Sequence, residues 1–385
     1  MLFTLCAGAA LLAWLAVLVA PWQPHRTRER LEADSAAPRD LSDVTVLIPA
    51  RDEAPVIART LAALRLQGEG LEVVVVDDQS TDGTREICAA LAAETSSALA
   101  VTVVVGSALP SGWAGKLWAL EQGLARVRRP LTLLLDADIE LAACTVPALR
   151  RRAEEHVAVL VSVLAELHCE SLVEKLLTPA FVLFFKLLYP FALANDARRR
   201  TAAAAGGCML VRTDDLRSLG GFASIRGALI DDCSLAAALK RAGGTTWLGL
   251  SHSVHSLRAY GFRDFWRMVS RSAFTQLGYS PPLLLAASAA MAITLLGPPV
   301  VLVVASLGHG AAQGAVGAVA LSALAWLAMT AAYWPVIRFY HLRALWATTL
   351  PAAGVLFLAM TWGSAFAYWR GTKATWKNRT YASTP

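Results

Sequence analysis

Charged residues are missing from three long stretches of this 385-residue chain, which is 56% hydrophobic and only 17% charged. No Asp, Glu, Lys or Arg occurs in residues 2–25, 272–337 or 344–369, and apolar runs of such length can cross a bilayer. Residues 40–270 hold nearly all the acidic groups and resemble a soluble domain in composition. The distribution excludes intrinsic disorder and a purely soluble globule, and it argues against a channel or transporter alone.

The chain also lacks paired cysteines and two common phosphate-binding motifs. Its six cysteines are scattered singly, so neither a disulfide framework nor a zinc site is indicated, which suits a reducing compartment. There is no Gly-x-x-x-x-Gly-Lys-Ser/Thr loop, and no Gly-x-Gly-x-x-Gly follows the first predicted strand. ATPase and dinucleotide oxidoreductase functions are therefore not expected.

The net charge of +6 comes from 35 Lys and Arg against 29 Asp and Glu. Many of the positive residues flank the apolar runs, which membrane topology explains better than a nucleic-acid footprint. We expect a membrane as partner and no nucleic acid. The flanking residues are Arg26, Arg28, Arg30, Arg338, Arg343, Arg370, Lys373, Lys377 and Arg379.

Four membrane spans are expected. Residues 1–25 read as an uncleaved transmembrane helix, because the arginines follow its apolar core, with residue 26 onward in the cytoplasm. Residues 281–370 are long enough for three more C-terminal helices. Three crossings would put the basic tail, 371–385, outside the cell, against the positive-inside tendency. Either the tail is an exception, or one apolar segment lies in the interface or re-enters.

Between the membrane regions, short apolar strands alternate with helical patterns. This alternation predicts an α/β domain over 40–280 with a mostly parallel sheet. Within it, segment 176–195 predicts either a core helix or an interfacial helix whose Lys186 and Tyr189 reach headgroup level. The predicted strands are 44–49, 71–76, 101–105 and 131–135, and the predicted helices are 54–66, 83–94, 116–127 and 145–155.

Polar clusters follow three of these strands. Residues 51–53 are Arg-Asp-Glu, residues 77–84 are Asp-Asp-Gln-Ser-Thr-Asp-Gly-Thr, and residues 136–138 are Asp-Ala-Asp. Singly, each is explained by helix caps and turns. Together, at the carboxyl edge of one sheet, they predict one ligand-binding crevice. In an extended chain Asp136 and Asp138 face the same way and suit a divalent cation, Mg or Mn, bound to a nucleotide's phosphates.

At this point the chain resembles a known family. The series IPARDE, VVVVDDQSTDGT, GKLWALEQGL, LLLDADIEL, GGCMLVR and LIDDCSLAAAL is similar to the family 2 inverting glycosyltransferases with a GT-A (nucleotide-diphospho-sugar transferase, Rossmann-like) fold. The membrane layout resembles the branch that includes ceramide glucosyltransferase. The motifs resemble most closely the hopene-associated glycosyltransferases of bacterial hopanoid clusters. The resemblance implies a multi-pass protein of the bacterial inner membrane with a cytoplasmic catalytic domain.

The resemblance also implies roles for individual residues. Pro49, Ala50, Arg51 and Glu53 match the segment that cradles the nucleotide base, and Asp78 matches the acid that contacts base or ribose. Lys116 matches a lysine at the edge of the donor pocket, although it is also explained as a solvated residue of a first helical turn. The donor and metal segment is Asp136, Ala137 and Asp138, with Asp138 as the direct metal ligand, and Gly206 and Gly207 match a loop close to the donor sugar or acceptor.

Asp232 matches the catalytic base, with Asp231 as cap or orienting partner. Both open a helical pattern and are also explained as N-terminal residues of that helix. We expect the helix dipole to lower the pKa of Asp232 slightly.

Where many relatives carry Gln-x-x-Arg-Trp, this chain keeps only Arg271, and the missing Gln and Trp argue against a processive polysaccharide synthase. Arg271 is expected to act in the reaction, since it shares a helical face with Arg267 and both can reach the diphosphate or acceptor. The expected function is transfer of one sugar from a UDP-linked or other nucleotide sugar to a membrane lipid acceptor, with hopanoids among the candidates. Transfer to a polyprenyl phosphate and a non-enzymatic nucleotide-sugar-binding protein are the alternatives. His252 and His255 are left outside the metal site.

Overall fold

The computed structural model of the chain describes residues 2–93, 99–307, 313–371, 375–376 and 379–380. It divides into two compact units. The helical unit consists of Met1–Arg28, Cys169–Pro190 and Tyr260–Thr372. The sheet unit consists of Glu29–His168, Phe191–Ala259 and Lys373–Pro385.

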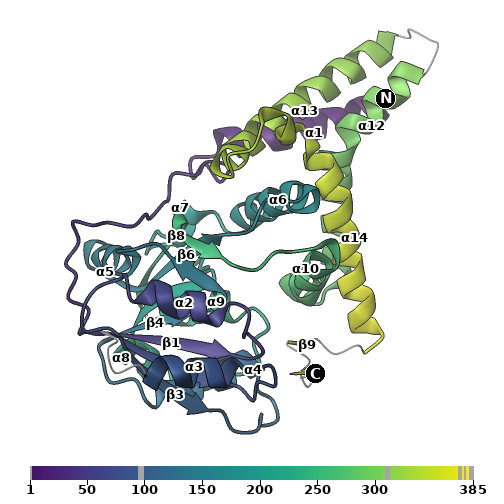
Figure 1. Cartoon of the computed structure of the whole chain (residues 1–385). Helices are drawn as coiled ribbons and strands as arrows, with labels where there is room; N and C mark the ends of the chain where they lie inside the picture. Colours follow the sequence, from purple (N-terminus) through teal and green to yellow (C-terminus); the bar gives the residue numbers. More distant parts are fainter. Residues whose placement is uncertain (1, 94–98, 308–312, 372–374, 377–378, 381–385) are drawn as a thin grey trace. The chain divides into compact units, whose positions relative to one another are not determined.

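The sheet unit begins with the predicted alternation of strands and helices (Figure 1). The first four strands pair in parallel in the order β3-β2-β1-β4, because a helix after each of β1, β2 and β3 returns the chain to the same edge. These strands are β1 (Val44–Ala50), β2 (Glu72–Asp77), β3 (Ala100–Val105) and β4 (Leu131–Leu135), and the helices are α2 (Ile57–Leu64), α3 (Thr84–Ala93), α4 (Gly115–Leu124) and α5 (Thr145–Glu155).

The second half of the sheet departs from the predicted parallel arrangement. Strand β7 (Cys208–Arg212) runs antiparallel to β4 and to β6 (Ala158–Glu166), and β5 (Ile139–Leu141) runs antiparallel to β8 (Thr245–Ser256). Only β6 and β8 are parallel in this half. The full order β3-β2-β1-β4-β7-β6-β8-β5 is therefore a mixed sheet with a parallel half, and the expected mostly parallel sheet is correct for that half only.

Helices cover both faces of the sheet, so strand residues alternate between two cores. Val46 and Ile48 of β1 pack on the face covered by α2, α3 and α5, whereas Leu47 packs on the opposite face with α4. That second face is closed by α8 (Thr213–Ser218), η1 (Gly221–Ile225) and α9 (Asp231–Arg241). Burial on both faces explains the uninterrupted apolar runs of these strands. The polar residues are left for the loops at the strand ends.

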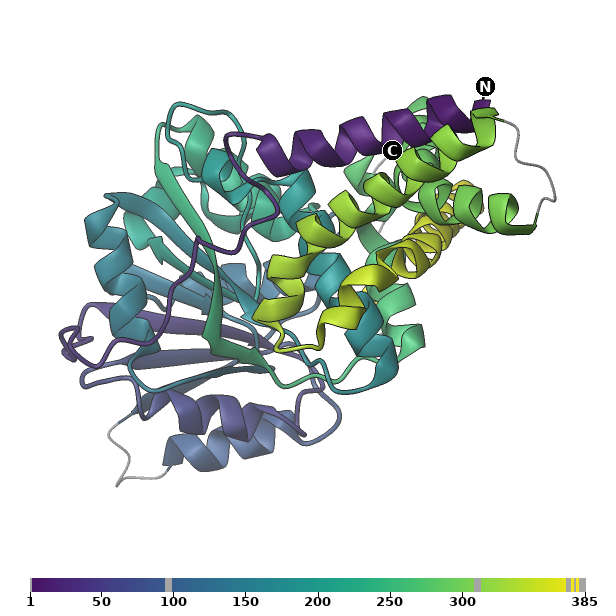
Figure 2. The ribbon, with the colours of Figure 1, turned by 90° about the horizontal axis from the view of Figure 1, so that it is seen from above.

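The helical unit contains three helices long and apolar enough to span a membrane, at Pro281–Val304, Val316–Phe339 and Ala344–Trp369. The N-terminal helix is apolar but shorter, and it packs against α13 and α12 (Figure 2). The elements are α1 (Leu2–Val19), α6 (Leu172–Leu188), α10 (Phe262–Gln276), α11 (Pro281–Met291), the π-helical η2 (Ala292–Leu296), α12 (Gly297–Leu307), α13 (Gln313–Phe339), η3 (Ala344–Thr349) and α14 (Leu350–Trp369).

Segment 176–195 belongs mainly to α6, which the helical unit contains. The helix starts at Leu172 because Ser171 and Glu174 form a capping box, and it ends before Pro190, which disfavours a helical residue ahead of it. Short helix α7 (Phe191–Ala194) follows in the sheet unit. The expectation that Lys186 reaches headgroup level is wrong, because its side chain is buried on the face that carries Val182 and Leu183.

Gly123 allows α4 to approach the sheet. An added Cβ would lie 2.2 Å from Leu47 Cδ1 and 2.7 Å from Val76 Cγ2. We expect Gly123→Val to destabilise the sheet unit by about 1–3 kcal/mol through overpacking, and thus to lower the thermal unfolding midpoint by several degrees. Ala125→Val is the matched control, because Ala125 lies at the end of the same helix and is exposed. Equal midpoints for the two variants would show that the close approach is unimportant.

Candidate active site

The loops after β1 and β2 are hydrogen-bonded to each other. The Asp78 N–H donates to the Ala50 carbonyl at 2.7 Å, and the Glu53 N–H donates to Thr84 Oγ1 at 2.8 Å. The Arg51 guanidinium donates to the Asp78 carbonyl, with its Nη1 3.9 Å from Asp78 Oδ2. The first two predicted clusters therefore form one wall.

Asp78 is the most deeply placed acid of this wall. Its side chain is fully buried, and that of Arg51 is 14% exposed. Pro49 and Ala50 form the buried carboxyl end of β1 beside it, paired with Val76 and Asp77 of β2. Carboxylate oxygens accept hydrogen bonds, and those of Asp78 are covered by the surrounding residues of the wall.

The Asp136-Ala137-Asp138 segment is a tight turn from β4 to β5, not the extended chain expected from its spacing. The Ile139 N–H donates to the Asp136 carbonyl at 3.1 Å and closes the turn. Ala137 points into the core, and its carbonyl accepts a hydrogen bond from Thr60 Oγ1 at 2.8 Å. Because of the turn, the two aspartates bind different cationic side chains.

Lys116 links Asp136 to α9, the helix that carries Asp232, the expected base. At the start of α4, its Nζ lies 2.6 Å from Asp136 Oδ1 and 3.7 Å from Asp231 Oδ2. Burial lowers the pKa of Lys116, but the carboxylates of Asp136 and Asp231 outweigh it and raise the pKa above its usual value. Burial raises the pKa of Asp136, against the lowering effect of Lys116. Lys116 is thus charged and central, not a solvated helix residue.

Asp232 opens α9 and is held by two backbone donors. The Gly206 N–H donates to Oδ2 at 2.8 Å, and the Cys233 N–H donates to Oδ1 at 2.7 Å. Burial, followed by the nearby Asp231 carboxylate, raises the pKa of Asp232 to about 6. The expected lowering by the helix dipole is therefore wrong in sign, because desolvation of a carboxylate outweighs the helix terminus and the two hydrogen bonds.

Gly206 brings these groups together. An added Cβ would lie 3.3 Å from both Asp232 Oδ2 and Lys116 Nζ, so a side chain would crowd the base and the lysine at once. Its carbonyl also accepts a hydrogen bond from Lys116 at 3.4 Å. The neighbouring Gly207 carbonyl accepts one from the Asp136 N–H at 3.0 Å. The glycine pair thus ties the Asp136 turn to the start of α9.

Arg258 is the site residue that the sequence did not reveal. It follows the end of β8, and its Nε lies 2.8 Å from Asp138 Oδ2 while its Nη2 lies 3.1 Å from Glu53 Oε1. One guanidinium therefore links the first loop to the Asp136–Asp138 turn. The available signal was its place directly after the last long strand, which was not among the strands predicted.

Arg271 lies in the helical unit, on the exposed side of α10. Arg267, one turn earlier, pairs with Asp264 at 2.8 Å. The other predicted site residues all belong to the sheet unit. A role for Arg271 in the reaction stays a prediction.

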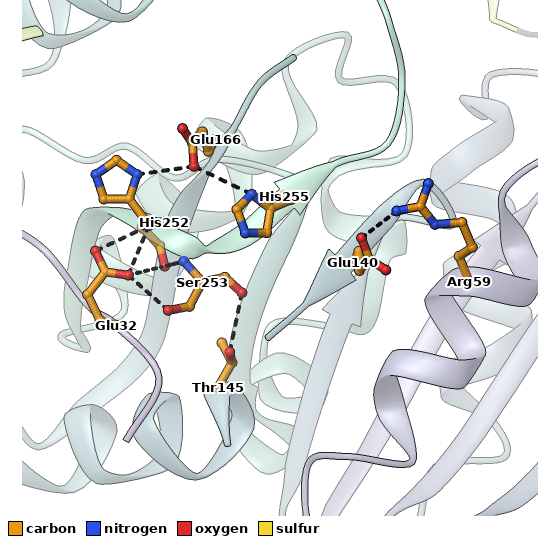
Figure 3. Close-up of polar contacts among 9 residues, drawn as sticks. Glu32, Arg59, Glu140, Thr145, Glu166, His252, Ser253 and His255 are labelled. Atoms are coloured by element: carbon orange, nitrogen blue, oxygen red, sulfur yellow. Dashed lines mark hydrogen bonds and ion pairs between the residues drawn. The ribbon is translucent and has the colours of Figure 1, made fainter. Parts of the chain in front are cut away.

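A separate polar cluster lies along β8 (Figure 3). His252 Nδ1 and His255 Nδ1 lie 3.1 and 3.4 Å from the same oxygen of Glu166, and Glu32 accepts hydrogen bonds from the His252 N–H and Ser253 Oγ. Within the described part of the chain, no three His, Cys, Asp or Glu residues form a group that would hold a metal ion.

The donor chemistry of the Asp136–Asp138 turn nevertheless fits a divalent cation. Carboxylate oxygens are the ligands that Mg²⁺ and Mn²⁺ prefer, and such sites often complete their coordination with substrate phosphates and water. Asp138 is 14% and Asp136 33% exposed, so both side chains are partly open to solvent. Each is neutralised by one cationic side chain, Arg258 or Lys116, and not by both.

The fold is that of the nucleotide-sugar transferases called GT-A. The chain is similar to the structure of a mannosyltransferase from Pyrobaculum calidifontis in complex with GDP-Man and Mn²⁺, with a TM-score of 0.52, 20% identity, and coverage of 92% of this chain and 99% of that one. At this identity the similarity shows the fold alone. The predicted fold class, a GT-A domain combined with apolar helices, is confirmed.

Residues 45–220, a little less than half of the chain, match the model of the family described as Glycosyl transferase family 2, which supports a glycosyltransferase domain in this segment. It is 34% identical over 121 residues to an undecaprenyl-phosphate 4-deoxy-4-formamido-L-arabinose transferase of Shewanella sediminis (strain HAW-EB3), which covers 30% of this chain. It is 32% identical over 98 residues to a 4,4'-diaponeurosporenoate glycosyltransferase of Staphylococcus haemolyticus (strain JCSC1435), which covers 26% of this chain. The matched segments span 35% and 24% of these relatives.

Arg258 should matter more for stability than an exposed arginine in a similar pair. Arg258→Met leaves Asp138 and the 11% exposed Glu53 without their shared cation. Breaking a buried pair costs about 3–5 kcal/mol, but the guanidinium is 37% exposed, so we expect about 1–3 kcal/mol after solvent screening.

Thermal unfolding of the purified protein measures this difference. Arg59→Met is the control, because Arg59 is 62% exposed and pairs with Glu140 at 2.7 Å. We expect little change there, as is usual for surface pairs. If the two variants unfolded at the same temperature, the bridging role of Arg258 would be rejected.

Proposed function

We propose that the protein is an inverting glycosyltransferase that moves one sugar from a nucleoside diphosphate sugar to a lipid hydroxyl at the membrane. The observation that carries this proposal is the state of Asp232. Its carboxylate is partly buried, fixed by two backbone N–H groups, and has a pKa raised to about 6. A base with such a pKa is ionised at neutral pH and still accepts a proton readily.

The donor occupies the crevice at the carboxyl edge of the sheet in this proposal. Arg51, Glu53 and Asp78 form the wall for the base and ribose, and Asp136 and Asp138 hold the cation beside the diphosphate. Their support is the hydrogen-bonded wall and the acidic turn described above. When bound, a divalent cation neutralises charge on the departing diphosphate. Lys116 adds a fixed positive charge on the same side.

The reaction is a single displacement. Asp232 accepts the proton of the acceptor hydroxyl while that oxygen forms a bond to the anomeric carbon. The bond from this carbon to the diphosphate oxygen breaks, its electron pair stays with the nucleoside diphosphate, and the anomeric configuration inverts. Asp231, beside Lys116 at 3.7 Å, orients the start of α9 and keeps the lysine near the leaving group.

The acceptor is a lipid because the same chain carries three helices able to span a membrane. We prefer an acceptor lipid that receives one sugar, such as a hopanoid, and a UDP-linked donor. We also infer that the protein lies in the bacterial inner membrane with its catalytic domain in the cytoplasm. These choices rest on the sequence motifs, and α1 would serve as the first anchor.

A second candidate acceptor is a polyprenyl phosphate. The relative from Shewanella sediminis, matched at 34% identity, is named for undecaprenyl phosphate. A phosphate is already anionic and needs no strong base, so transfer to it would not depend on Asp232. The two acceptors therefore predict different effects of the same substitution.

Release of nucleoside diphosphate tests the function directly. Purified protein is mixed with UDP- or GDP-linked sugars and either a lipid alcohol or a polyprenyl phosphate. We expect release to require the lipid alcohol, to disappear with EDTA, and to fall at least about 100-fold in Asp138→Asn, because the leaving group loses its counter-charge. Lipid-dependent release that occurs only with polyprenyl phosphate would select the second candidate. No release with any pair would reject both.

Asp232→Asn tests the base. Asparagine keeps the size of the side chain but accepts no proton, so we expect turnover to fall about 10²–10⁴-fold while nucleotide binding persists. In the unsubstituted protein, kcat/KM should be constant above about pH 6 and fall tenfold per pH unit below it, since Asp232 must be deprotonated to act.

Asp214→Asn is the matched control for this substitution. Asp214 also lies in the first turn of a helix, α8, but is exposed, and its substitution should leave turnover and the pH profile unchanged. Near-normal turnover in Asp232→Asn with a lipid alcohol would eliminate Asp232 as the base.

A further inference from the structure

The number of membrane crossings in the helical unit decides on which side of the bilayer the chain ends. The chain leaves the sheet unit at Ala259. It then passes through α10 and the three candidate spans, 281–304, 316–339 and 344–369. If each of them crosses the bilayer, the chain ends on the side opposite to Ala259. The contacts of α14 argue against that outcome.

The end of α14 lies beside the residues that precede α11. The Tyr368 ring stacks on Tyr279 with centroids 4.5 Å apart, and the Trp369 ring lies 5.7 Å from Phe274. Helix α11 begins two residues after Tyr279, at Pro281. The last residues of α14 are therefore at the membrane depth at which the first candidate span begins.

The second half of α14 also packs along α10, which carries charges on its exposed side. Ser270 Oγ donates to the Met360 carbonyl and the Phe274 N–H donates to Ser364 Oγ, both at 3.1 Å. Asp264 and Arg267 on α10 are 46% and 77% exposed. A charged side chain at the centre of a bilayer costs about 2.5–3.5 kcal/mol or more, so α10 belongs at the interface and holds α14 there.

The first candidate span is interrupted where it leaves α14. Helix α11 contacts α14, with Trp362 Nε1 donating to Ser288 Oγ at 2.9 Å, whereas α12 packs with α1 and α13. The π-helical η2 lies between them and Pro298 lies in the first turn of α12, and such features bend helices. Figure 1 shows α12 and α13 beside α1, while α14 runs with α10.

The charges give a second, independent argument. After Asp264 the sequence contains no Asp or Glu and eight Lys or Arg residues. Arg267 and Arg271 precede α11, and Arg338 and Arg343 lie at the turn after α13. If α14 does not cross, these four and the four basic residues of the tail all share one side; if it crosses, they divide four and four. A shared side agrees with the positive-inside rule.

We propose that α10 and α14 form a membrane-resting surface, and that α14 keeps the chain on the side of the bilayer on which α11 begins. The partner of this surface is the lipid leaflet on that same side, with anionic headgroups facing the cations of α10. Val355, Phe366 and Trp369 are each about half exposed and face the acyl chains. Strands β9 (Thr375–Trp376) and β10 (Arg379–Thr380) of the tail pair antiparallel with each other.

A pair of reporters attached to the full chain tests this proposal. Alkaline phosphatase is active only in an oxidising compartment, and a fluorescent protein that folds only in the cytoplasm reports the opposite side. Each is fused after Pro385 and, as the matched control, inserted after residue 310 between α12 and α13. We expect fluorescence without phosphatase activity at Pro385, and phosphatase activity without fluorescence at residue 310.

Phosphatase activity after Pro385 would overturn the proposal, because α14 would then cross. Identical signals at the two positions would overturn it as well. Residue 310 follows one proposed crossing and Pro385 follows two, so the proposal places them on opposite sides. The result does not depend on whether the protein transfers sugar, so failure of this proposal and failure of the proposed function are distinguished.

Discussion

The site depends on two cationic side chains that allow four aspartates to gather at one edge of the sheet. Asp136, Asp138, Asp231 and Asp232 come from two distant segments, and carboxylates removed from water repel one another and tend to take up protons. Lys116 lies against Asp136 and Asp231, and Arg258 against Asp138. Lys116 joins the turn after β4 to the start of α9, and Arg258 joins the same turn to the loop after β1. These segments are the sides of the proposed reaction centre.

The same arrangement gives the aspartates different chemistry. Asp136 and Asp138 each contact a cation, whereas Asp232 is held through the N–H groups of Gly206 and Cys233. No ion pair of Asp232 is formed among the residues that the structure describes. Hydrogen bonds from neutral donors stabilise a carboxylate less than a full charge does. Burial raises the pKa of both Asp232 and Asp136, so these two acids differ in their partners and not in the direction of the pKa shift.

Much of the fold was predictable from sequence because its signals are local. Strands β1 to β4 read as apolar runs, and each loop after them that carries acids was recognised. The antiparallel half was not predicted, because β7 pairs with β4 only after a long excursion through the helical unit. Arg258 was missed for the same reason, since it acts through residues more than a hundred positions away.

Two further predictions failed because each depends on competing effects whose relative sizes sequence does not reveal. The helix terminus at Asp232 is visible as a motif, but its effect on the pKa competes with desolvation, which depends on packing by Gly206 and Lys116. The interfacial alternative for segment 176–195 placed Lys186 at headgroup level because lysine usually reaches water, yet its position on α6 aligns it with buried Val182 and Leu183, as the alternative of a core helix predicts. In both cases the sequence identified the residue but not how far its side chain is removed from water.

Desolvation also connects the chemistry of the site to its choice of acceptor. Water at 55 M competes with any lipid hydroxyl for the sugar, so a lipid-specific transferase must keep water away from the base. The raised pKa of Asp232 has the same cause, because a carboxylate in contact with bulk water would titrate near its ordinary value. A base made accessible to water would therefore lose both its raised pKa and its protection against hydrolysis. The raised pKa of Asp232 thus reflects its burial together with the neighbouring Asp231 carboxylate.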